Sequence, residues 1–237
     1  MKCSRWAELT ETLKFHVNTA HIAGGPTEFR MLNGKLLYFI LPRRNKSKLG
    51  NLMLFILQLF HVIGVSPISI GSSAQGDESG LPILNAILDG APSGGTPLCQ
   101  HVRDVTQKIS AISSELRAAG KKAALIICTD GEASDGDITA ALKPLHDLPV
   151  WVVIRLCTDQ DDIVGYWNNV DNMIELNMDV IDDPMGESTE IQALNTWMTY
   201  GMPLHRLREF GVTAKEIDML DEVKLSPEQM HKFCAYL

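Results

Sequence analysis

The chain is 237 residues long, with 45% hydrophobic and 21% charged residues, which excludes a collagen-like or disordered protein and suits one large domain with residues to spare. Acidic residues outnumber basic ones by 29 to 21, for a net charge of −8. Because nucleic-acid-binding surfaces usually need a clustered basic face, we do not expect a nucleic-acid partner.

The cysteines and the N-terminus point to an intracellular protein. Five cysteines are scattered without any C-x-x-C pair, so neither a disulfide framework nor a zinc site is expected. Met1 to His21 lacks the apolar core and the cleavage site of a signal peptide. We therefore expect a cytoplasmic location.

The first predicted elements are a helix and a strand. Apolar residues recur at helical spacing from Trp6 to Ala20, and Gly24-Gly25-Pro26 would end this helix. Glu28–Leu32 is typical of a short strand. Pro67-Ile68-Ser69-Ile70 would be its hairpin partner if the residues between them are set aside.

The stretch from Lys35 to Ser66 differs in composition from the rest of the chain. A basic patch precedes Leu49–Val65, a run of 17 residues that is apolar except for three polar positions. Three interpretations compete: a membrane helix, for which the run is short; a helix or hairpin buried in the fold; and an insertion foreign to the domain, such as a translated intron. We prefer the insertion, because the strands on either side of it would then pair directly.

The middle of the chain alternates helices and buried strands. Leu98 to Ala119 has the apolar spacing of a helix across a sheet, with Gly120 just past its end. The continuous apolar runs Ala123–Thr129 and Val150–Cys157 predict strands buried on both faces of a parallel sheet. A helix between them, over Ile138–His146, fits a right-handed crossover.

The later elements are weaker in the sequence. Met173–Leu176 is a candidate for a last short strand, and a helix is expected in the region Ile191–Tyr200. Two further helix starts follow, Thr213 with Glu216 and Ser226-Pro227-Glu228-Gln229. They predict surface helices packed on the domain, or alternatively a docking peptide for a partner.

These elements predict an α/β fold: a doubly wound, mostly parallel sheet with helices on both faces. We divide the chain into a domain at 1–203, with 35–66 as its insertion, and a C-terminal helical extension at 204–237.

Acidic residues gather just after the first buried strand, where ligands bind in open α/β sheets. Asp130, Glu132 and Asp135 would repel one another unless they are solvated or neutralised, and a hard divalent cation is one neutraliser. Thr96, in a Gly-rich loop, could add a neutral oxygen ligand. The alternative interpretation is a solvated acidic loop.

Two segments carry a resemblance to a known family. Gly94-Gly95-Thr96-Pro97-Leu98, followed by Leu125 to Asp135, resembles the second and third segments of the metal-ion-dependent adhesion site (MIDAS) of von Willebrand factor type A domains. The resemblance covers about Arg5 to Tyr200 without the 35–66 stretch, and it implies a Rossmann-like fold. It also implies that Thr96 coordinates Mg²⁺ or Mn²⁺ through its hydroxyl, and that Asp130 holds the ion through water. The rim of the binding site would include Gly95, Glu132 and Asp135.

The chain departs from this family at one segment. The family's first segment, Asp-x-Ser-x-Ser after the first strand, supplies two serine ligands and a carboxylate, and nothing in this chain matches it. We therefore expect the first central strand to be missing and the metal site to be incomplete. Our hypothesis is that the chain starts one strand too late, at Met1.

The resemblance implies a divalent-metal-dependent protein-binding domain rather than an enzyme. Its partner would be a protein that contributes an Asp or Glu to the ion, and a membrane partner is not expected. The alternative is a Mg²⁺-dependent hydrolase or phosphotransferase with Asp130 as metal ligand or nucleophile. A third interpretation is a defective fragment without independent function.

Overall fold

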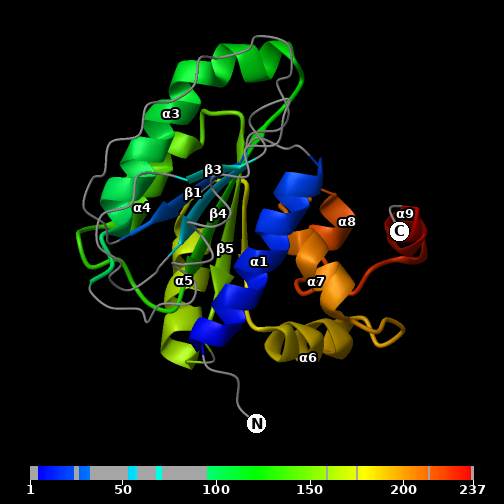
Figure 1. The fold of residues 1–237 in the computed structure, drawn as a ribbon. Coiled ribbons are helices and arrows are strands. Elements are labelled where there is room, and N and C mark those ends of the chain that lie inside the picture. The colour runs from blue at the N-terminus through cyan, green and yellow to red at the C-terminus, as the bar shows by residue number, and fades with distance from the viewer. Residues whose placement is uncertain are drawn as a thin grey trace.

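The computed structural model describes residues 5–23, 27–32, 53–57, 68–70, 95–158, 160–174, 176–212 and 214–235. Within them, helices pack on both faces of a six-stranded sheet with strand order β3-β1-β2-β4-β5-β6 (Figure 1). Five strands are parallel, and β3 is antiparallel at one edge. The strands are β1 (Thr27–Met31), β2 (Met53–Leu57), β3 (Ile68–Ile70), β4 (Ala123–Thr129), β5 (Val150–Leu156) and β6 (Met178–Ile181).

The pairing of β1 with β3 at the edge of the sheet confirms the predicted pairing of two strands that are far apart in the sequence. Phe29 pairs with Ile68 and Thr27 with Ile70 in antiparallel register. The Ile68–Ile70 segment is therefore the partner of the first predicted strand, as the pattern on either side of the 35–66 stretch indicates.

The strand β2 comes from inside the 35–66 stretch. Met53–Leu57 lies between β1 and β4 and pairs in parallel with both. These five residues are thus a strand, so neither the membrane helix nor a buried helix fits them. The rest of that stretch lies outside the described residues, and the buried hairpin, the foreign insertion and the missing first strand stay predictions.

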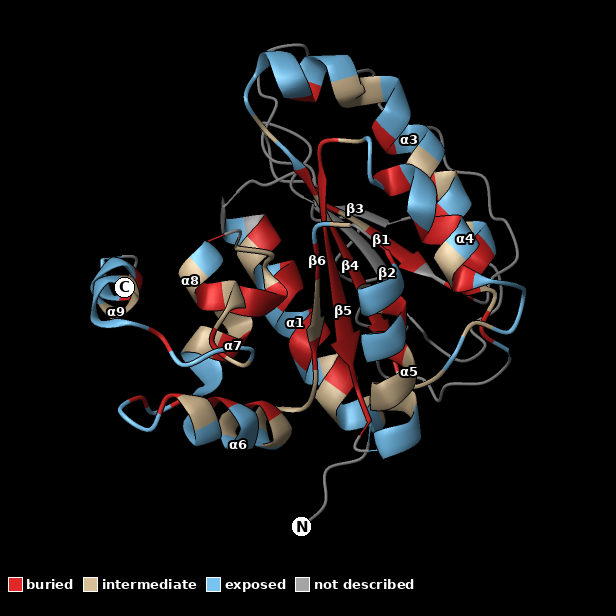
Figure 2. Ribbon diagram, turned by 180° about the vertical axis from the view of Figure 1, so that it is seen from behind, coloured by how far each residue is buried: buried red, intermediate tan, exposed pale blue. Residues whose placement is uncertain are grey.

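Continuous apolar runs form β4 and β5 because both faces of the sheet are covered. Leu125 and Ile127 face one core with α3 (Leu98–Ala118), α4 (Ile138–Leu142) and α5 (Asp161–Met173). Ile126 and Cys128 face a second core with α1 (Arg5–Ala23). Figure 2 shows both strands buried along their length. The predictions of β4, β5, α1 and α3 are confirmed. The predicted helix after β4 is α4, which is continued by a 3₁₀ turn, Lys143–Leu145.

Two later predictions are wrong in position. The last strand is Met178–Ile181 and not Met173–Leu176, because α5 continues to Met173. Instead of a helix over 191–200, α6 spans Pro184–Leu194, with Asp183 as its N-cap and Pro184 in its first turn. The helix stops at Asn195, whose buried amide donates to the Leu220 and Val223 carbonyls.

The C-terminal helices form a small packed unit with its own core. They are α6, α7 (Met202–Glu209), α8 (Lys215–Asp218) and α9 (Pro227–Cys234), and the core runs from Ile191 to Phe233. The predicted capping box at Ser226 and Gln229 is confirmed at the start of α9, whereas α7 has no counterpart among the predictions. The division after residue 203 falls inside α7. None of the helices in the described part of the chain combines the length and apolar character of a membrane span.

A buried ionic cluster ties α7 to the sheet and to α1. Glu209 is fully buried, and its carboxylate accepts a hydrogen bond of 2.8 Å from Arg155 Nε on β5 and one of 2.6 Å from Arg206. His16 Nε2 on α1 lies 3.3 Å from the same carboxylate, and Arg155 also pairs with Glu8 of α1. Burial alone would raise the pKa of Glu209, but these donors hold it well below its ordinary value. The carboxylate therefore stays ionised in the interior.

Removing this charge should weaken the fold strongly. Glu209→Gln leaves the buried Arg155 short of counter-charge, so we expect the free energy of unfolding at pH 7 to fall by about 3 kcal/mol. Urea unfolding measures the loss. The control is Glu228→Gln, which removes an exposed pair with Lys232 at 3.1 Å and should cost less than about 0.5 kcal/mol. Equal losses in the two variants would contradict a central role for Glu209.

Candidate functional site

The two segments that carry the family resemblance meet at the end of β4. The Thr96 amide donates to Ser134 Oγ at 2.9 Å, and the Ser134 amide donates to the Thr96 carbonyl at 2.8 Å. A Cβ on Gly95 would lie 3.4 Å from the same hydroxyl, so the loops approach closely at a residue without a side chain. Thr96 is buried at 8% exposure. The structure thus brings Thr96 and the loop after β4 together.

Asp135 caps helix α3 instead of standing free on the rim. Its carboxylate accepts hydrogen bonds from the Cys99 amide at 2.9 Å and the Gln100 amide at 2.8 Å. These are donors in the first turn of the helix, which have no partner within the helix itself. Burial opposes the charge, but the amide donors outweigh it and hold the pKa of Asp135 below its ordinary value. The contact joins the loop after β4 to the start of α3.

Asp130 lies one residue beyond β4, and a cation from α1 faces it. Arg5 Nη1 is 3.7 Å from Asp130 Oδ2, with 17% of the Asp130 side chain and 43% of the Arg5 side chain exposed. Burial raises the pKa of Asp130, and Arg5 opposes that shift. The next residue is fixed as well, because the Gly131 carbonyl accepts from Trp167 Nε1 at 3.2 Å. Glu132, which follows, is exposed.

Within the described residues, two side chains at this edge could be ligands of Mg²⁺. They are the Thr96 hydroxyl and the Asp130 carboxylate, and other oxygens would have to complete the octahedral set of six. Ser134 and Asp135 are engaged with backbone amides, and the described part of the chain holds no cluster of three or more His, Cys, Asp or Glu side chains that could bind a metal. The sequence after β2, Gln58-Leu59-Phe60-His61, adds no Asp or Ser.

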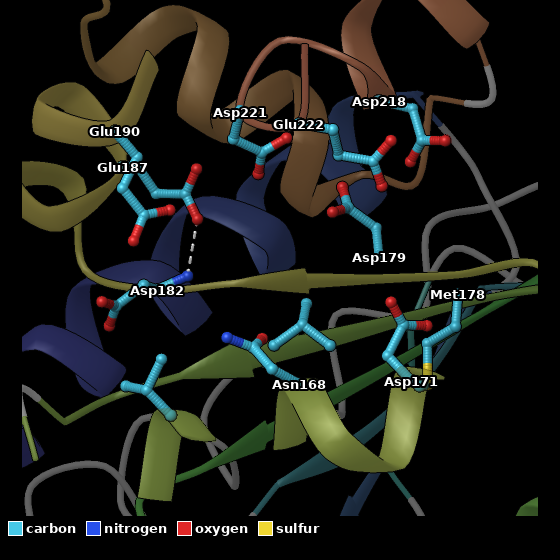
Figure 3. Close-up of a pocket in the computed structure, with 12 residues that line it drawn as sticks. Asn168, Asp171, Met178, Asp179, Asp182, Glu187, Glu190, Asp218, Asp221 and Glu222 are labelled. Carbon is cyan, nitrogen blue, oxygen red and sulfur yellow. Dashed lines mark hydrogen bonds between the residues drawn. The ribbon is translucent and has the colours of Figure 1, made fainter. Parts of the chain in front are cut away.

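A second feature, an acidic cavity of about 180 Å³, lies away from this edge (Figure 3). It lies between the sheet side, formed by α5 and β6, and the helices α6 and α8. Eight of the side chains that line it are carboxylic acids: Asp171, Asp179, Asp182, Glu187, Glu190, Asp218, Asp221 and Glu222.

Burial raises the pKa of the acids around this cavity, and neighbouring carboxylates add to the shift. The pKa of Asp218 rises to about 7 and that of Asp171 to about 6. Burial also raises the pKa of Glu187 to about 7 and that of Asp182 to about 6. The cavity therefore holds protons at a pH where isolated carboxyl groups are ionised.

Sequence reasoning did not find this cavity. Its acids are spread over more than fifty residues, from Asp171 to Glu222, and lie in four different elements and in the loops that follow two of them. An excess of acidic residues in this part of the chain was the one available signal. It does not tell acids that share a cavity from acids that are exposed to solvent.

Comparison with known proteins assigns no family, since no protein-family model matches this sequence and no curated protein matches it either.

The capping role of Asp135 leads to a prediction at the start of α3. Asp135→Asn keeps one acceptor oxygen but loses the charge and the second acceptor, so we expect the free energy of unfolding to fall by about 1–2 kcal/mol. The control is Glu132→Gln in the same loop, an exposed position where the change should stay within about 0.5 kcal/mol. If both variants unfolded at the same urea concentration, Asp135 would have no capping role.

Proposed function

We propose that this chain is a protein-binding domain of the von Willebrand factor type A kind, and that partners bind at the edge formed by Thr96 and the loop after β4. The observation that carries the proposal is the pair of hydrogen bonds between Thr96 and Ser134. They join the two segments of the MIDAS resemblance into one surface. No catalytic role is assigned to the edge.

The sheet topology supports this choice of edge. The chain passes from β2 outward to β3 and then, through α3, to β4 on the other side of β2. In doubly wound sheets, ligands bind outside the carboxyl ends of the strands at the point where the strand order reverses. Here that point lies between β2 and β4, and Asp130 follows β4 directly. We accordingly propose a Rossmann-like, doubly wound fold.

The partner in this proposal is a protein that presents an Asp or Glu side chain. The resemblance implies that this carboxylate binds to Mg²⁺ or Mn²⁺, and that Thr96 and Asp130 hold the ion. The ligands that the family takes from its Asp-x-Ser-x-Ser segment, however, have no counterpart among the described residues. Arg5 is a partly exposed cation at the same edge. Asp130 positions Arg5, and the guanidinium can pair with an incoming carboxylate without a metal.

A peptide-display screen tests this proposal. We expect wild-type protein to enrich peptides that contain Asp or Glu, and we expect Arg5→Gln and Asp130→Ala each to weaken binding of a selected peptide about tenfold, the value of one charge-assisted contact. The first variant removes the cation, and the second removes the carboxylate that positions it. Glu228→Gln, far along the chain on α9, is the control and should bind like wild type.

Equal affinity in wild type and both edge variants would contradict the proposed binding edge. Circular dichroism of each variant establishes that it is folded. Hydrolysis of p-nitrophenyl phosphate in Mg²⁺, abolished by Asp130→Ala, would favour the phosphotransferase interpretation instead.

Calorimetric titration with Mn²⁺ tests the metal separately. Because the edge offers few oxygen ligands, we expect wild-type protein to bind Mn²⁺ no more tightly than the millimolar range, and Thr96→Ala and Asp130→Ala to abolish the remaining heat. A micromolar dissociation constant lost in both variants would show a complete site after all. A micromolar constant unchanged in all three proteins would place the ion elsewhere.

A further inference from the structure

The acidic cavity lies where the C-terminal helices meet the sheet. Asp171 on α5 and Asp179 on β6 line one side, while Glu187 on α6 and Asp218 on α8 line the other (Figure 3). In the figure, Asp179, Asp218 and Glu187 lie on one side of the β6 ribbon, and Asp171 lies on the other side, next to α5. The cavity therefore lies where two parts of the fold meet, and both parts contribute acidic side chains to it.

One buried arginine compensates part of this charge. Arg208 of α7 is fully buried, and its guanidinium donates to Asp179 at 2.9 Å and to Asp221 at 2.8 Å. It also pairs with Glu187. These contacts join β6, α6 and the turn after α8 around a single positive charge. Within the described part of the chain, five further carboxylates around the cavity make no direct contact with Arg208: Asp171, Asp182, Glu190, Asp218 and Glu222.

Full ionisation of these acids is costly while the cavity is closed. Carboxylates that share a poorly solvated space repel one another, and protonation is the way that buried acids relieve this cost. Asp218 faces Asp179, Asp221, Glu222 and Arg208. Asp171 faces the same three acids. Binding of protons near neutral pH therefore stabilises this contact.

We propose that this cavity is a proton-dependent clasp: protonation of its carboxyl groups holds α6 and α8 against β6 and α5, and ionisation loosens these two helices from the sheet.

The direction of the pH effect follows from the raised pKa values. An acid whose pKa is higher in the closed state stabilises that state fully below its ordinary pKa, and the contribution is lost as the pH rises through the shifted pKa. For Asp218 the loss extends from about pH 4 to about 7, and for Asp171 to about 6. The clasp is thus strongest in mild acid and weakest in mild base.

The opening stays local because α7 is anchored by a different cluster. Glu209 is ionised and paired with Arg155, so raising the pH through neutrality does not change its charge. The neighbouring Tyr200 and His205 face Arg208 and Glu209, and burial lowers the pKa of His205, which favours its neutral form. The pH response therefore belongs to α6 and α8.

Hydrogen exchange measured by mass spectrometry at pH 5.5 and 8.0, corrected for intrinsic exchange rates, tests the clasp. In wild-type protein we expect protection of Pro184–Leu194 and Lys215–Asp218 to fall about tenfold or more between these pH values, since each proton bound on closing changes the equilibrium tenfold per pH unit. Protection of α3 should not change. The double variant Asp171→Asn/Asp218→Asn should lose much less protection than wild type between these pH values, because only Glu187 and Asp182, whose pKa values are also raised, still titrate in this range.

The matched control is Glu132→Gln/Asp147→Asn, which removes two exposed acids outside the cavity and should respond to pH like wild type. Circular dichroism at pH 5.5 establishes that both double variants fold. The proposal is overturned by constant α6 protection in wild type, by an equal fall in α3, or by a double variant of the cavity that keeps the wild-type response.

Discussion

The fold depends on a carboxylate that lies inside the protein and is still charged. Glu209 and Arg155 are 54 residues apart in sequence and meet at 2.8 Å between α7 and β5. An isolated buried carboxylate would be costly, so this arrangement holds only because Arg155, Arg206 and two imidazoles surround it. The same cluster contacts Glu8 and His16 on α1. A single set of charges therefore holds α1 and α7 on one face of the sheet.

Arg208 directly precedes Glu209 in the chain and belongs to a second cluster of charges. In this second cluster, negative charges outnumber positive ones. Arg155 and Arg206 are balanced by Glu209 and Glu8, whereas Arg208 faces three carboxylates directly and five more around the cavity. The first cluster is insensitive to pH near neutrality, and the second binds protons there. Neighbouring residues of one helix thus hold a fixed contact and an adjustable one.

The proposed binding edge is built differently, mainly from hydrogen bonds between polar side chains and the backbone. Thr96 and Ser134 exchange two of them, Asp135 caps α3, and Trp167 fixes Gly131. Such contacts rigidify a loop without using hydrophobic burial, which leaves Asp130 and Arg5 at the surface. A rigid, polar edge beside partly exposed charges suits recognition of a protein partner, in keeping with the function proposed.

The sequence by itself determined the elements whose signals are local: the periodic helix α3, the apolar strands β4 and β5, and the capping box that begins α9. The resemblance to the metal-ion-dependent adhesion site also implied that Thr96 and the loop after β4 would meet. Only the tertiary structure decided the positions of β6 and α6, the place of β2 between β1 and β4 in the sheet, and the existence of α7. Asp179, Arg208 and Glu209 resemble surface residues in the sequence. These residues can be buried because they form ion pairs with residues from distant elements. No local sequence pattern encodes such ion pairs.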